Sequence, residues 1–206
     1  MRIIARLVFL VVLVLICLTA WVGIRGWLAK DHLQASADLV SRLQTQLEEG
    51  STGPAKDTVT RMQHETADAV RLTGDPVWRA ATHLPGVGDD LSAVHQVALS
   101  GHTLSTDALP SIAAAAAQVE VLRGGASQSS PAQLVAAAKQ LQVPLRTADA
   151  GVTRARAQIS GVDPAGLMGP VRTGVEQLDS GLATLQGTLA TLIRLDSTGL
   201  KAAAAA

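Results

Sequence analysis

The stretch that decides the fold is PVRTGVEQLDSGLATLQGTLATL, residues 170–192. Its apolar residues recur at alternating spacings of four and three: Val171, Val175, Leu178, Leu182, Leu185, Leu189 and Leu192. This spacing lines one face of an α-helix, whereas a half-buried strand alternates with a period of two. The opposite face carries Arg172, Glu176, Asp179 and Gln186. The stretch therefore predicts an amphipathic helix that packs against another helix.

A second stretch, residues 134–159, has the same spacing and is the expected partner. Residues 161–169 join the two stretches, and short connections favour antiparallel neighbours. We expect a hairpin whose apolar seam consists of Leu134, Leu141, Leu145, Val152, Ile159, Val175, Leu178, Leu182, Leu185 and Leu189. Pro144 is expected to kink the first helix of this hairpin, because proline removes a backbone donor and clashes with the preceding turn.

The remaining segments also follow the helical period, and none alternates with a period of two. Helices are expected to end at Gly50, Gly74, Pro110 and Gly124. Residues 29–49 are expected to continue a membrane helix as a stalk. The predicted fold class is all-α: an N-terminal transmembrane helix that continues into an elongated antiparallel helical bundle with coiled-coil-like seams.

The membrane helix is predicted from residues 7–24, LVFLVVLVLICLTAWVGI, which contain no charge. Eighteen residues are just enough to cross a hydrocarbon core about 30 Å thick. Trp21 and Trp27 follow where indole rings favour the membrane interface. A cleaved signal peptide is the first alternative, but Leu18 is too large for the small-x-small cleavage pattern. A buried soluble helix is the second alternative.

The charges around this segment leave its orientation close to a tie, since Arg2 and Arg6 precede it and Arg25 and Lys30 follow. A short tail before such a segment favours a cytoplasmic N-terminus, so the bulk of the chain is expected outside. These four basic residues lie before residue 31, so residues 31–206 contain 13 of the 17 basic side chains. The same residues contain all 17 acidic side chains. A mildly acidic body lacks the basic footprint that nucleic acid requires.

No catalytic constellation is found. His95 and His102 are seven residues apart and can share a helix face, but helical zinc ligands favour a spacing of four. Both are expected to be solvated, and Asp89 with Asp90 is expected to cap a helix rather than to act as acid and base. Aromatic residues make up only 2% of the chain, which leaves few for a cofactor pocket. We therefore expect no enzyme activity, no metal and no cofactor.

The stretch DPVWRAATHLPGVGDDLSAVHQVA, residues 75–98, differs from the rest because it is dense in Pro and Gly and contains a Trp. It predicts a helix corner, with Trp78 and Leu84 packed under the turn. Asp89 is expected to cap the outgoing helix. The residues that define the corner are Asp75, Pro76, Trp78, Leu84, Pro85, Gly88 and Asp89.

These corner residues resemble the N-terminal region of an actinobacterial membrane-anchored family, the domain-of-unknown-function family 4012. The resemblance covers roughly residues 1–190, and it implies an envelope setting but no reaction. The family continues into a larger C-terminal domain, whereas this chain ends in Lys201 and five alanines. The resemblance therefore implies a truncated member, or its helical half alone.

The expected organisation is an anchor at residues 1–30, a stalk and first hairpin at 31–74, a bundle at 75–200 with its corner at 75–90, and a low-complexity tail at 201–206. The favoured function is an extracytoplasmic helical scaffold or interaction module in the bacterial cell membrane. Its expected partners are the membrane, through a single N-terminal span, and a protein partner or missing C-terminal domain. The alternative is a receptor-type sensor ectodomain that binds a small ligand.

Overall fold

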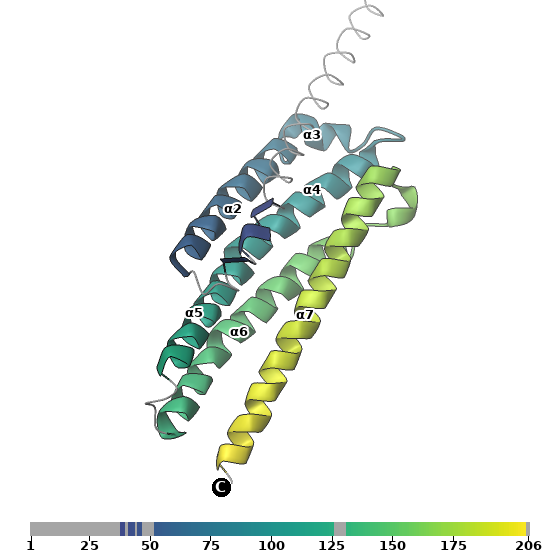
Figure 1. Cartoon of the computed structure of the whole chain (residues 1–206). Coiled ribbons are helices and arrows are strands. Elements are labelled where there is room, and N and C mark those ends of the chain that lie inside the picture. The colour runs from purple at the N-terminus through teal and green to yellow at the C-terminus, as the bar shows by residue number, and fades with distance from the viewer. Residues whose placement is uncertain (1–37, 40, 44, 47–51, 126–130, 205–206) are drawn as a thin grey trace, which may run out of the picture.

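The computed structural model describes residues 38–39, 41–43, 45–46, 52–125 and 131–204 (Figure 1). Over these residues it contains helices and turns and no strand, which confirms the all-α prediction. The elements are α2 (Thr52–Thr73), α3 (Pro76–Ala81), α4 (Gly88–Thr103), the π-helix η1 (Leu104–Ala108), α5 (Leu109–Gly125), α6 (Pro131–Ile159), the 3₁₀-helix η2 (Pro164–Gly166) and α7 (Gly169–Ala204).

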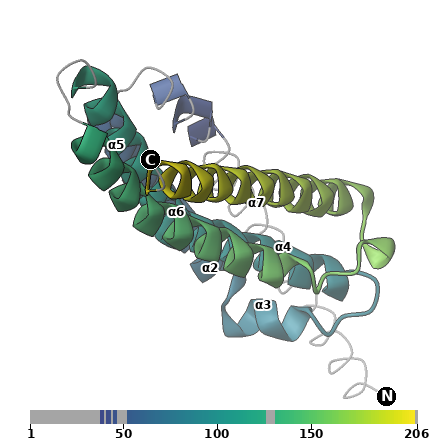
Figure 2. The same cartoon turned by 90° about the horizontal axis from the view of Figure 1, so that it is seen from below.

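The helices pack side by side along one long direction, as the two views in Figures 1 and 2 show. α4, η1 and α5 follow one another without a break and form the central rod. α2 packs on α4, α6 packs on the rod, and α7 packs mainly on α6. α6 and α7 run antiparallel and are joined by residues 160–168, so the predicted hairpin is present.

The prediction that Pro110 ends a helix is wrong. Helical structure continues from Gly88 to Gly125, and Pro110 is the second residue of α5. Directly before it the chain forms η1, in which the Leu109 N–H donates to the Leu104 carbonyl five residues earlier. Pro110 has no N–H to donate, but it lies where the hydrogen-bond pattern changes from π to α. The helix therefore continues through it. α6 also continues through Pro144.

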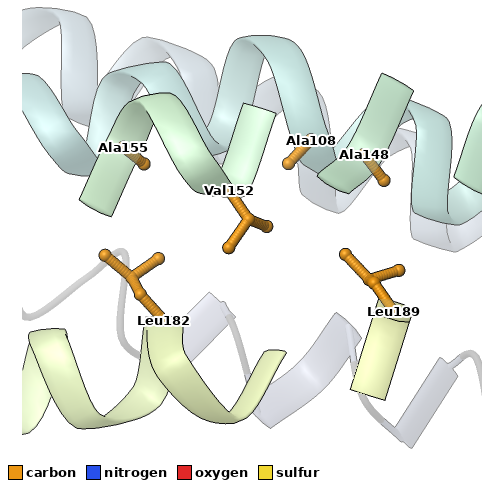
Figure 3. Packing of buried hydrophobic residues seen from close by; sticks show 6 residues of the cluster. All are labelled: Ala108, Ala148, Val152, Ala155, Leu182 and Leu189. Atoms are coloured by element: carbon orange, nitrogen blue, oxygen red, sulfur yellow. The ribbon is translucent and has the colours of Figure 1, made fainter. Parts of the chain in front are cut away.

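Among the described residues, three apolar clusters form the core. The central cluster joins the rod, α6 and α7, and Figure 3 shows its side chains converging: Ala108, Ala148, Val152, Ala155, Leu182 and Leu189. A second cluster lies at the start of α2 and contains Leu43, Ala55, Val59, Met62 and Leu109. A third lies near the corner and contains Ala93, Ile159, Leu167 and Val175. Small residues dominate the central cluster, which allows the helices to approach closely.

Most of the predicted seam is placed along the α6–α7 contact. Val152, Ile159, Val175, Leu182 and Leu189 are buried, and Leu141, Leu145 and Leu178 are half-buried. Leu185 is 37% exposed, so it does not lie at the centre of the seam as expected. The buried line on α7 is the one through Val175, Leu182 and Leu189, and Leu185 lies to one side of it. The side chain of Leu134 lies outside the described residues.

The described part of the expected stalk packs against the bundle. Leu43 is only 5% exposed and contacts the start of α2 and Leu109. The Thr58 hydroxyl donates to the Gln46 amide oxygen at 2.8 Å. Leu43 and Gln46 therefore lie against the bundle and do not lead away from it. The predicted membrane helix, residues 7–24, lies outside the described residues, and among the helices that are described none is long and apolar enough to cross a membrane.

Candidate functional site: the corner and the polar seam between α2 and α4

The corner is built around Asp75 and Trp78. The Asp75 carboxylate accepts a hydrogen bond from the Trp78 backbone N–H at 2.8 Å and so caps α3. Trp78 is 1% exposed, and its indole N–H donates to the Leu91 carbonyl of α4 at 3.1 Å. The buried indole thus joins α3 to α4 with its one polar group satisfied.

Two glycines make the turn possible. Gly86 has a φ of +85°, a conformation that other residues rarely adopt. At Gly88 an added β-carbon would lie 2.1 Å from the Thr82 carbonyl oxygen, so the backbone can approach this closely only without a side chain. Both glycines belong to the stretch that the sequence singled out as a corner.

Two details of the predicted corner are wrong. Leu84 is 41% exposed and does not pack under the turn. Asp89 is exposed and does not cap α4, because the N-cap position is Val87, which makes no side-chain bond. The neighbouring Asp90 points inward instead: it is 4% exposed and accepts a hydrogen bond from the Met168 N–H at 2.8 Å. Asp90 thereby ties the first turn of α4 to the loop before α7, a link between distant segments that the sequence did not reveal.

The polar seam between α2 and α4 consists of two Thr–His pairs. His95 Nδ1 lies 3.0 Å from the Thr73 hydroxyl oxygen, and His102 Nδ1 lies 3.3 Å from the Thr66 hydroxyl oxygen. Both threonines are buried, at 0% and 2% exposure. Both histidines are half-buried, so they are not fully solvated as expected. The two histidines are seven residues apart on α4, and the two threonines are seven residues apart on α2. Because the two helices run antiparallel, the first histidine meets the second threonine, and the second histidine meets the first threonine.

The seam continues into the π-helix. The Thr66 hydroxyl lies 2.9 Å from the Ser105 hydroxyl, and Ser105 is fully buried. The Gln63 side-chain amide donates to the Ser105 carbonyl at 3.0 Å. π-turns inside α-helices are frequently found at functional sites, and this one places a serine against two polar residues of α2.

The Thr73 hydroxyl joins His95 to the backbone of α2. It lies 2.8 Å from the Ala69 carbonyl oxygen and 3.0 Å from His95 Nδ1, so it bridges the two groups. Burial lowers the pKa of His95, and the nearby Arg79 guanidinium lowers it further.

His95 borders a shallow hollow beside the corner. Its lining residues are Val70, Arg71, Gly74, Asp75, Arg79, His95 and Leu99, and its volume is about 610 Å³. The two guanidinium groups favour an anion, although Arg71 also pairs with Asp68 and the Asp75 carboxylate caps α3. In the described part of the chain no group of three or more His, Cys, Asp or Glu side chains is placed to hold a metal ion.

On the other face of the rod, α6 crosses at very short distance. A β-carbon added to Gly151 would lie 2.9 Å from the Ala108 nitrogen of η1 and 3.0 Å from the Ala108 β-carbon. One turn before η1, the buried Ser100 hydroxyl donates to the Ala155 carbonyl at 2.9 Å. The π-helix is therefore held between α2 and α6, a relationship that no local sequence pattern predicts.

Comparison with family models, curated proteins and solved structures finds no match for this chain. Every role given to a residue above therefore rests on the geometry of this chain itself.

Proposed function

We propose that this protein is a membrane-anchored scaffold whose helical body lies outside the cytoplasmic membrane of a bacterium. The uncharged residues 7–24 supply the anchor, and the short N-terminal tail with Arg2 and Arg6 favours a cytoplasmic start. The corner residues, which resemble those of family 4012, support an envelope setting. No reaction is assigned to the body.

The main support for this proposal is that the central rod is held between α2 and α6. Gly88 to Gly125 form one helical run of about 55 Å at 1.5 Å per residue. On one side Gln63 and Thr66 of α2 bond to Ser105, and on the other side Gly151 of α6 packs against Ala108. A long rod held from both sides resists bending, which suits a body that positions a partner at the membrane.

Anchoring and orientation are tested on the full chain in a bacterial host. We expect the protein to remain in the membrane pellet after alkaline carbonate extraction. Alkaline phosphatase fused after residue 206 should be active, because that enzyme works only when exported. Replacing Val12 and Leu15 with Arg should release the chain from the pellet, while the matched control Val12→Leu with Leu15→Val should not. A wild-type chain extracted by carbonate would refute the anchor.

The scaffold role requires rigidity, which is tested separately. Spin labels on Lys139 of α6 and Arg61 of α2, both exposed, report the distance between the two helices that clasp the rod. We expect one narrow distance distribution in the membrane-inserted chain. A broad distribution would contradict a rigid scaffold.

The hollow beside His95 favours a second candidate, a sensor ectodomain that binds a small anion. Arg79 would supply its positive charge and its hydrogen-bond donors. Phosphate should then raise the unfolding temperature of the full chain, and the increase should disappear in Arg79→Gln. Equal shifts in the wild type and in this variant would remove the sensor from consideration.

A further inference from the structure

α7 carries an exposed flank that contains no charge. Its five members are Gly174, Gly181, Leu185, Thr188 and Leu192, and all are exposed. At 3.6 residues per turn they fall within a sector of about 60°, beside the buried line of the helix. The charged residues between Gly169 and Arg194 all lie on the other side: Arg172, Glu176, Asp179 and Arg194.

The two glycines of this flank make no close packing contact with the part of the chain that the structure describes. A β-carbon added to Gly174 or Gly181 would meet nothing within 4 Å. Neither glycine has a positive φ, so neither is needed to shape the backbone. Glycine inside a helix costs stability relative to alanine. A flank that combines such glycines with leucines that are 37% and 44% exposed has the features of an interface for another helix.

The order of these residues makes the flank complementary to itself. If two copies of α7 lie antiparallel with Ala183 at the centre, Gly181 faces Leu185 of the second copy and Gly174 faces Leu192. Each leucine then fills the space that a glycine leaves open. The relation is reciprocal, as a two-fold contact requires. In a parallel pair with the helices in register, glycine would face glycine and leave that space empty.

We infer that α7 is a homodimerisation helix, and that a second copy of this chain covers the flank in an antiparallel two-fold pair. The contact from Gly174 to Leu192 is only about 27 Å long, so it belongs among small interfaces of less than about 1,200 Å². A reversible dimer that depends on protein concentration is therefore expected. Self-association through this flank does not require the membrane anchor.

The register is tested with disulfides in the full chain in detergent. Cys17, the only cysteine, is first replaced with Ser. Two differently tagged chains are then mixed, one with Gly181→Cys and one with Leu185→Cys. An antiparallel pair should give the mixed disulfide, since these positions face each other across the contact. A mixture of Ser180→Cys and Gly187→Cys, two positions on the far side of α7, should give none above background.

The glycine pocket is tested with two matched substitutions. Gly181→Leu and Gly187→Leu each add a β-carbon that has nothing within 4 Å of it, at an exposed position, so both should fold. Only Gly181→Leu fills the space that Leu185 of the second copy occupies in the proposed dimer. It should weaken dimerisation at least tenfold in sedimentation experiments, whereas Gly187→Leu should leave it unchanged. A chain that is monomeric at all concentrations, a dominant 181–181 disulfide, or equal dimerisation of the two variants would overturn the inference.

Discussion

Gly151 of α6 and Ala108 of η1 lie in direct backbone contact, with only 2.9 Å between the Ala108 nitrogen and the place where a Gly151 β-carbon would be. This spacing holds the π-helix against α6 and brings Val152 and Ala155 into the central cluster. A side chain at position 151 would push the two helices apart. The central rod therefore depends on a glycine in the middle of a long helix.

Replacing Gly151 with Ala should destabilise the protein. In an exposed helix this change is worth up to about 1 kcal/mol in favour of alanine. Here the added methyl group overpacks the crossing, which typically costs about 1–3 kcal/mol. Chemical denaturation of the full chain in detergent measures the difference. Gly187→Ala, where the new methyl group meets nothing, should keep or raise the stability; if Gly151→Ala does so too, the close crossing is wrong.

His95 should make the stability fall as the pH drops below about 6.5. Burial and Arg79 lower its pKa in the folded state, so the unfolded chain binds the proton more readily. Its stabilising contribution is complete above the unfolded value of about 6.5 and is lost as the pH falls through the lower folded pKa. Unfolding temperatures between pH 7.5 and 5.5 test this, before most carboxylates titrate. His95→Gln should flatten this part of the profile, and an unchanged slope would argue against His95 as its source.

The two leucines at the centre of α7 should respond differently to a charge. Leu182 is 1% exposed, so Leu182→Asp loses leucine contacts worth about 2–5 kcal/mol and also buries a carboxylate. Against a total stability of about 5–15 kcal/mol, the bundle should largely unfold. Leu185→Asp, at a position 37% exposed, should still fold. Circular dichroism melts distinguish the two, and similar melting of both variants would contradict the placement of α7.

Sequence periodicity predicted the helices and the α6–α7 hairpin because both depend on regular spacing along one segment. Asp75 and Trp78 were also placed correctly, since a cap and a buried indole are local features. Leu185 was misplaced because a spacing of four and three defines a broad face and does not say which line is buried. The Thr–His pairs, Gly151 with Ala108, and Asp90 with Met168 join segments far apart in sequence. Such contacts depend on how the helices are placed relative to one another, and the local patterns of a single sequence do not reveal this placement.

Asp89 and Asp90 are adjacent in sequence but should differ in their importance for stability. Asp90 is buried and accepts the Met168 N–H at 2.8 Å, so Asp90→Ala leaves that donor without its partner. Loss of a buried partner costs about 1–3 kcal/mol. Asp90→Asn keeps an oxygen that can accept, so it should recover part of this loss. Asp89 is exposed and its removal should change the free energy of unfolding by no more than about 0.5 kcal/mol. Denaturant titration of the three variants tests the order, and a larger loss for Asp89→Ala than for Asp90→Ala would show that the loop before α7 is held by other contacts.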